Sequence, residues 1–173
     1  MNMANQTVLI VVLFVGGLFP GPREGYAQRG QGAPVGARPT VPSFKVVGKD
    51  SAALSIVVPA DVTEVQLVAL MNSFRAARAN GTLAKLIPPT TPNGSRGPYA
   101  AVEIFVFTDE AWPTSTRLHA FRNPQTSGIS ASEKAFGANI RAYYLHPLAG
   151  EEFGSISYED QGYKYTAIYK KLF

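Results

Sequence analysis

The sequence predicts an α+β fold, a two-layer sandwich in which about two helices cover one face of a mixed or antiparallel sheet. Three observations support this class. Short β-forming segments lie at both ends of the region 43–173, a long amphipathic helical pattern follows the first pair of them, and no internal repeat of fixed period is visible. Strands and helices that do not alternate regularly favour helices gathered on one side of a sheet.

The chain length and composition fit one folded domain. The 173 residues are 46% hydrophobic and 16% charged, which excludes a highly charged disordered chain and a long coiled coil. The chain contains no cysteine, so it has no disulfide, thiolate zinc site or cysteine nucleophile. We expect a single α+β domain at residues 43–173.

The N-terminal segment has the pattern of an export signal. Residues 8–19 read VLIVVLFVGGLF, an apolar run shorter than the roughly 20 residues of a membrane span. Gly25-Tyr26-Ala27 places small residues at positions −3 and −1 of a cleavage site, although no Lys or Arg precedes the run. We predict that residues 1–27 are a signal peptide and that the mature bacterial protein is periplasmic or secreted, without an integral membrane span. An uncleaved signal-anchor or a buried N-terminal helix is the alternative.

Residues 28–42 are rich in Gly and Pro and have few apolar side chains. Such a stretch gains too little from burial to offset the entropy lost on ordering. We therefore expect a flexible leader between the signal peptide and the domain.

The first half of the domain contains the clearest helix. Two strands are expected at 46–47 and 54–58, with a turn at 48–51. Thr63 and Gln66 have the spacing of a capping box, and Asn80-Gly81 is a helix stop, so a helix is expected over 63–80. Its apolar residues recur at helical spacing and are Leu67, Leu70, Met71, Phe74 and Ala77.

The second half is predicted to hold the central strand and a β-meander. Residues 99–108 read YAAVEIFVFT, which is apolar on both faces. A second helix is expected to start at Thr108 or Asp109, to use Trp112, Leu118 and Phe121 as apolar contacts, and to end before Pro124, with a short helical turn at 130–136. Three strands are then expected at 140–145, 153–158 and 163–172.

Enzyme motifs are absent from the sequence. No phosphate-binding loop, dinucleotide fingerprint, zinc-protease motif or nucleophile elbow occurs. The two histidines have no metal-ligand spacing, and we expect neither a metal site nor a cofactor. The catalytic alternative is a small hydrolase-like enzyme or a ligand-binding fold, with a site between the 88–98 loop and the end of the central strand. Its candidate residues are Glu103, a carboxylate within an apolar strand, Asp109 and His119.

The favoured hypothesis is a non-enzymatic binding domain. The net charge is +4, but the basic residues are scattered, which argues against a nucleic-acid partner. Six of the eight tyrosines lie within residues 143–173, and in a strand over 163–172 Tyr163, Tyr165 and Tyr169 would share one face. We predict that this face binds a protein, a peptide or a glycan. The alternative is that these rings pack between strands. The pattern does not indicate an oligomeric state.

Overall fold

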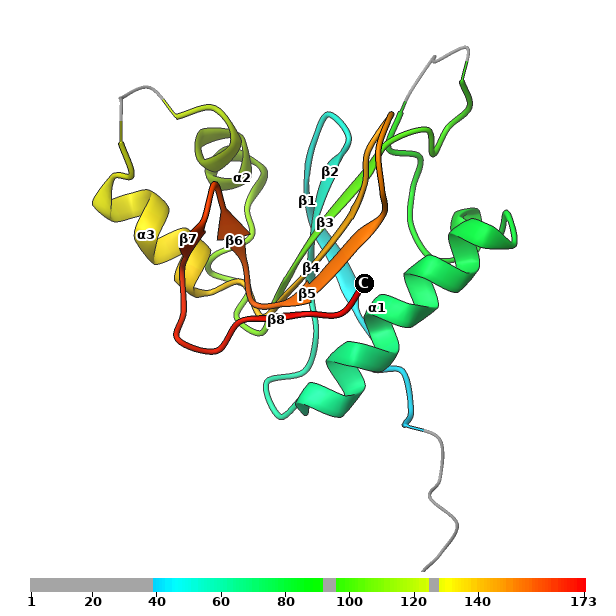
Figure 1. Ribbon diagram of the computed structural model, residues 1–173, viewed down its shortest axis with the longest axis horizontal. Helices are drawn as coiled ribbons and strands as arrows, with labels where there is room; N and C mark the ends of the chain where they lie inside the picture. The colour runs from blue at the N-terminus through cyan, green and yellow to red at the C-terminus, as the bar shows by residue number, and fades with distance from the viewer. Residues whose placement is uncertain (1–38, 92–95, 125–127) are drawn as a thin grey trace, which may run out of the picture. The chain divides into compact units, whose positions relative to one another are not determined.

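The computed structural model describes residues 39–91, 96–124 and 128–173, all within one compact unit that spans residues 37–173. In this part of the chain a six-stranded sheet lies between helices (Figure 1). The sheet has the order β1-β2-β3-β4-β5-β8, and β6 and β7 form a separate two-stranded ribbon. The strands are β1 (Lys45–Asp50), β2 (Ala53–Val57), β3 (Val102–Phe107), β4 (Ala142–His146), β5 (Phe153–Ile156), β6 (Glu159–Asp160), β7 (Tyr163–Lys164) and β8 (Lys170–Lys171). The helices are α1 (Glu64–Ala79), α2 (Ser115–Arg122) and α3 (Ala131–Ala138), with a 3-10 turn at Leu83–Lys85.

The sheet is mixed because one of its strand pairs is parallel. β2 and β3 run in the same direction and are joined by a connection that contains α1, whereas each other pair is antiparallel. A parallel pair needs a crossover of this kind, because a tight turn can join only antiparallel strands. β3 therefore lies inside the sheet, between β2 and β4.

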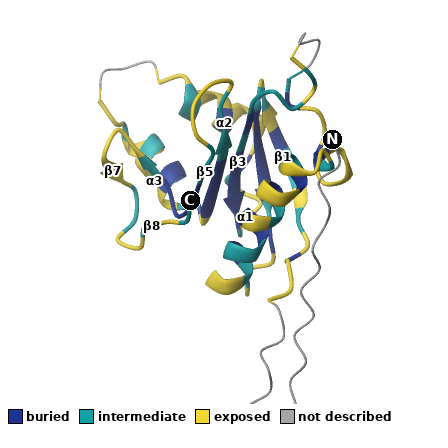
Figure 2. Cartoon of the chain, turned by 45° about the vertical axis from the view of Figure 1, so that its right-hand side comes forward, coloured by how far each residue is buried: buried dark blue, intermediate teal, exposed yellow. Residues whose placement is uncertain are grey.

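The sheet is covered by helices on both faces, and alternate residues of β3 reach two different cores. Val102, Ile104 and Val106 pack into the core beneath α1. Phe105 and Phe107 point to the opposite face and pack into the core beneath α2 and α3. Figure 2 shows the resulting pattern, in which the central strands are buried and the outer sides of the helices are exposed. The period of two in a strand explains why one continuous apolar segment can serve both cores.

The long helix agrees with the sequence pattern. The Thr63 side chain accepts a hydrogen bond from the Gln66 backbone N–H, and the Gln66 side chain accepts one from the Thr63 backbone N–H, which completes the capping box. Each residue of the predicted apolar stripe is buried against the sheet. Because the cap and the stripe are local features, the sequence identified this helix correctly.

The second helix begins later than predicted, at Ser115. Asp109 does not cap it: its Oδ1 accepts a hydrogen bond from the Ala111 N–H, 2.8 Å away, and closes a turn. Thr114 is the actual cap, since its side chain accepts from the Arg117 N–H. Asp, Ser and Thr side chains stabilise turns as well as helix starts, so the cap signal alone did not locate this boundary.

The continuous strand predicted over 163–172 is wrong. Tyr163 and Lys164 pair with β6, the next five residues lie outside any strand, and only Lys170 and Lys171 pair with β5. Positive φ angles at Ser157, Gln161 and Gly162 accompany the turns that lead the chain away from the main sheet. A strand pattern of period two does not reveal such an interruption.

The predicted α+β class with a mixed sheet is confirmed. The two helices that share one face are α2 and α3, while α1 covers the other. The predicted signal peptide, the cut after Ala27 and most of the predicted leader lie outside the described residues. No described helix is long and apolar enough to cross a bilayer.

Candidate functional site

Glu103 lies at the start of β3 and forms an ion pair with α2. Its Oε2 accepts a hydrogen bond from Arg122 Nε at 2.8 Å, and its Oε1 accepts one from the Tyr143 hydroxyl at 2.8 Å. Burial, and then the adjacent Glu103 carboxylate, raise the pKa of Tyr143 well above its usual range. Tyr143 therefore stays protonated and donates to Glu103. These two hydrogen bonds compensate for the cost of burying the Glu103 carboxylate within an apolar strand.

The same arginine connects α2 to the end of β1. Arg122 Nη1 donates to the Asp50 carboxylate at 2.9 Å and to the Asp50 carbonyl at 3.1 Å. His119 Nδ1 lies 3.2 Å from the other Asp50 oxygen. Burial alone would raise the pKa of Asp50, but the hydrogen bonds from His119 and Arg122 lower it overall. Asp50 is therefore a charged anchor for the C-terminal turn of α2.

The predicted catalytic residues do not converge. Glu103 and His119 belong to one network through Arg122 and Asp50, but Asp109 follows the opposite end of β3. Six residues of extended chain separate Glu103 from Asp109, a span of about 20 Å. The oxygens of Glu103 and Asp50 already accept hydrogen bonds from α2 or β4. The arrangement is that of ion pairs that hold α2 against the sheet, and no reacting group stands out.

The predicted tyrosine face is not a sheet face. Tyr163 is 41% exposed on β7, whereas Tyr165 and Tyr169 are partly buried and follow that strand. The Tyr165 ring lies 5.5 Å from Tyr158 and 5.8 Å from Phe121, measured between ring centroids. Burial first, and then the nearby acidic groups, raise the pKa of Tyr165 to about 12. Tyr165 thus packs the end of the β6–β7 ribbon against α2 and α3 and contacts the Tyr163 ring at 4.9 Å, so it is a packing residue and not part of an open strand face.

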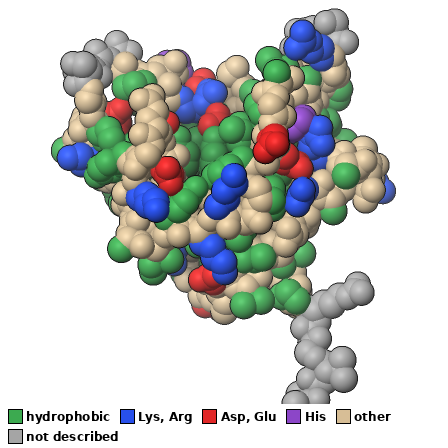
Figure 3. Space-filling model, viewed as in Figure 1, with side chains coloured by type: hydrophobic (Ala, Val, Ile, Leu, Met, Phe, Trp, Pro, Cys, Tyr) green, Lys and Arg blue, Asp and Glu red, His purple; other side chains and the backbone are tan. Residues whose placement is uncertain are grey.

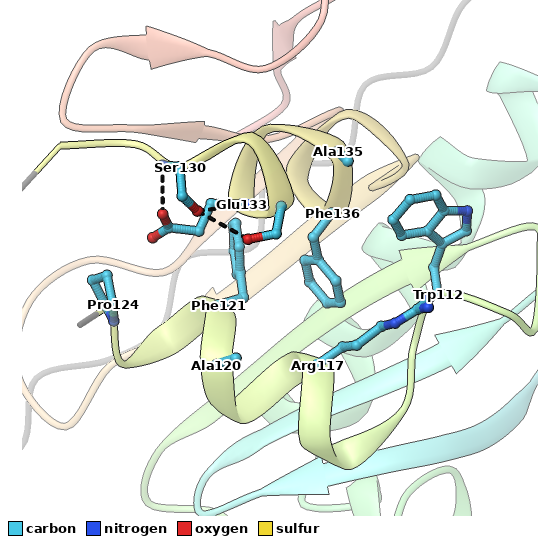
Figure 4. Close-up of a pocket in the computed structure, with 10 residues that line it drawn as sticks. Trp112, Arg117, Ala120, Phe121, Pro124, Ser130, Glu133, Ala135 and Phe136 are labelled. Carbon is cyan, nitrogen blue, oxygen red and sulfur yellow. Dashed lines mark hydrogen bonds between the residues drawn. The ribbon is translucent and has the colours of Figure 1, made fainter. Parts of the chain in front are cut away.

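A hollowed surface lined by aromatic side chains lies between α2 and α3. This α2–α3 groove has a volume of about 450 Å³ (Figure 4). Phe121 points into it from α2 and Phe136 from α3, with ring centroids 4.7 Å apart. Trp112 closes one end beside Arg117. The lining residues are Trp112, Arg117, Ala120, Phe121, Pro124, Ser130, Ser132, Glu133, Ala135 and Phe136.

The aromatic rings of the groove pack on the sheet, and its two ends are polar. Phe121 and Phe136 also contact rings of the sheet, namely Phe105 at 5.9 Å and Phe107 at 5.1 Å. At one end Arg117 donates to the Ala111 carbonyl and lies 5.2 Å from the Trp112 ring. At the other, Glu133 accepts from the Ser130 backbone N–H at 2.6 Å, and its hydrogen bonds with Ser130 lower its pKa. The groove is therefore apolar in the middle, with a cation at one end and an anion at the other.

Figure 3 shows Lys and Arg side chains interspersed with Asp and Glu on the visible face, around a group of hydrophobic side chains. In the described ranges no group of three or more His, Asp or Glu is placed to hold a metal ion.

The comparisons with known proteins leave the geometry as the only basis for function. No protein-family model, curated protein or solved structure matches this chain.

Three aromatic residues of the groove have the spacing of core positions in the sequence. The pattern predicts Trp112 and Phe121 as apolar contacts of the second helix, and Phe136 lies at the end of the predicted helical turn. Each would be read from its spacing as a core residue. Only the packing of α3 beside α2 shows that their side chains leave a groove between them.

Proposed function

We propose that this chain is an exported, non-enzymatic binding domain whose α2–α3 groove accepts a hydrophobic side chain of a partner polypeptide. The observation that carries the proposal is an aromatic-lined groove of about 450 Å³. Ligand sites in proteins have volumes of roughly 300–1,000 Å³, with mostly apolar walls and a few polar groups. The export part of the proposal rests on the apolar run 8–19 and on Gly25-Tyr26-Ala27.

The polar ends of the groove favour a polypeptide as its occupant. Arg117 retains guanidinium donors beyond the one used on Ala111, and Glu133 supplies carboxylate oxygens. A peptide main chain carries both carbonyl acceptors and N–H donors, so it can satisfy both ends while a side chain fills the middle. A simple hydrocarbon ligand offers neither group and would leave these polar atoms without partners.

Tyr165, next to the β6–β7 ribbon, packs against the aromatic lining of the groove. Tyr165 contacts Phe121, whose ring lines the groove. We therefore assign the binding role to Trp112, Phe121 and Phe136, and a supporting role to the tyrosines. Aromatic side chains in such positions are the usual energetic centres of protein interfaces.

The chain offers a direct optical test of this proposal. Trp112 lines the groove and is the chain's single tryptophan, so intrinsic fluorescence reports on groove occupancy. Peptides selected from a displayed random library on the full chain should be rich in hydrophobic residues and should change Trp112 emission. If no selected peptide alters the emission, the groove is not the binding site.

A pair of helix variants provides the matched control. Ala120 is an exposed groove-lining residue, so Ala120→Arg places a long side chain at the groove and should weaken peptide binding at least tenfold, or about 1.4 kcal/mol. Ala131 is exposed on α3 and does not line the groove, so Ala131→Arg should bind as the unmodified chain does. Ala and Arg have similar helix propensities, and both variants should fold. Equal binding by the two variants would contradict the assignment.

A further inference from the structure

A second depression lies on the far side of the sheet from the α2–α3 groove. It has a volume of about 490 Å³ and is formed by the C-terminal end of α1, the segment 96–100 and the end of β4. The residues that matter for its chemistry are Arg78 on α1, Arg96, Tyr99, and His146 at the end of β4. None of them belongs to the groove, and this site is independent of the function proposed above.

The two arginines of this depression have no acidic partner. Arg122 pairs with Asp50 and Glu103, and Arg75 lies 3.3 Å from Glu152. Within the described ranges, neither Arg78 nor Arg96 has a carboxylate within 4.0 Å. Two guanidinium groups therefore line one hollow without an ion-pair partner in the described residues, which leaves N–H donors available to an external acceptor.

His146 contributes a third polar group with an unmet requirement. Its Nδ1 is buried and has no hydrogen-bond partner in the described part of the chain. Burial lowers the pKa of His146, Arg78 lowers it further, and Glu152 opposes these effects. The ring therefore stays neutral near pH 7 in the free protein. A negative charge placed in the depression would favour its protonated form.

One wall of the depression is apolar and fixed in place. The Tyr99 hydroxyl donates to the Ile87 carbonyl at 2.9 Å, which holds the ring in position, and Leu83 lies beside it in the lining. The hollow is larger than a carboxylate or a phosphate group alone. It has room for an organic anion with an apolar part against Tyr99.

We propose that this depression binds the oxyanion head group, carboxylate or tetrahedral, of a small organic anion between Arg78, Arg96 and His146. The planar guanidinium group presents paired N–H donors that match the oxygens of a carboxylate, sulfate or phosphate. The bound head group offsets part or all of the positive charge of the two arginines, according to its own charge, and interacts with the His146 ring.

The test is an NMR titration of the imidazole resonances in the full chain. Only two histidines are present, so His146 and His119 can be assigned with single substitutions. Titrations in sodium sulfate and in sodium acetate are compared with sodium chloride at equal ionic strength. If the protonated ring binds the anion tenfold more tightly, saturation raises the His146 pKa by about one unit. The His119 resonances provide the internal comparison, because His119 lies on α2, on the opposite face of the sheet, beside Asp50.

Two charge-matched variants separate a specific site from general screening. Arg78→Gln should raise the His146 pKa in chloride, because a repelling charge is removed, and should abolish the response to sulfate or acetate. Arg141→Gln removes the same charge from an exposed residue that does not line this depression, and should keep the response. A response to sulfate alone or acetate alone supports the site and identifies its preferred head group. The proposal is overturned if neither anion shifts the His146 pKa, or if Arg78→Gln responds as the unmodified chain does.

Discussion

Replacement of Tyr165 by Ser distinguishes a packing tyrosine from a binding tyrosine. The ring contacts Tyr158, Phe121 and Tyr163, with centroid distances of 5.5, 5.8 and 4.9 Å. It also covers Gly137 of α3, where an added Cβ would collide with the Tyr165 ring atoms. Loss of the ring therefore removes the main contact between the β6–β7 ribbon and α3.

The expected destabilisation follows from the buried area. A buried tyrosine covers about 150–250 Å² and Tyr165 remains partly exposed, so about 100–150 Å² of ring surface is lost. At about 25 cal/mol per Å² the transfer contribution is ~2.5–4 kcal/mol, and relaxation of the ribbon reduces the effect to about 2–3 kcal/mol. No side-chain hydrogen bond of the Tyr165 hydroxyl is present in the described residues, so Tyr165→Phe should cost less than about 0.5 kcal/mol.

Urea unfolding followed by far-ultraviolet circular dichroism measures both changes. Tyr163→Ser provides a comparison, because this tyrosine is 41% exposed and should be replaced at a cost below about 1 kcal/mol. If Tyr165→Ser unfolds at the same urea concentration as the unmodified chain, the ring does not pack as described. The sequence-based hypothesis that Tyr165 belongs to an exposed binding face would then be restored.

Four further substitutions test the core beneath α1, the contact between β1 and the segment before α2, and the polar network. Phe74→Ala should cost about 3–5 kcal/mol because Phe74 is fully buried. Arg75→Ala removes the ion pair between the half-exposed Arg75 and the more buried Glu152, which is worth about 1 kcal/mol or less. Equal urea midpoints for the two variants would show that the helical phase is wrong. Gly48→Ala directs a methyl group at the Pro113 carbonyl oxygen and should lower the free energy of unfolding by about 1–3 kcal/mol, measured by thermal unfolding. An unchanged stability would mean that β1 and the Pro113 segment move apart easily. Asp50→Asn should destabilise by about 1–3 kcal/mol at pH 7. The folded-state pKa of Asp50 is lowered, so its contribution to stability is present above about pH 4 and disappears as the pH falls through that lowered pKa. If Asp50→Asn and the unmodified chain still differ in stability in strong acid, the difference does not come from the ion pairs.

The sequence indicates single unusual residues of the candidate sites but not the partners that they contact. Glu103 was noticed because a carboxylate interrupts an apolar strand, and that observation correctly implies that it needs a partner. The partner, Arg122, lies 19 residues away on a helix of the neighbouring layer. Nothing in either local pattern indicates this pair. The oxyanion depression likewise joins residues from three separate segments, and neither arginine stands out in the sequence.

Local interactions made α1 readable from the sequence by itself. Its capping box joins residues three apart, and its apolar stripe follows the period of the helix, so the sequence alone determined where it begins and which side is buried. The same reasoning identified β3 as a strand covered on both faces and predicted the α+β class, with a mixed or antiparallel sheet.

Only the tertiary structure decided which helix covers which face and where the last strand is interrupted. The apolar pattern of a helix shows which of its sides must be buried but not which face of the sheet that side contacts, because hydrophobic burial is non-directional. Tyr165, which follows the β6–β7 ribbon, packs against Gly137 of α3, a contact between residues far apart in the chain. The α2–α3 groove arises in the same way. Its rings follow core spacing in the sequence, but two packed helices leave part of their surface open.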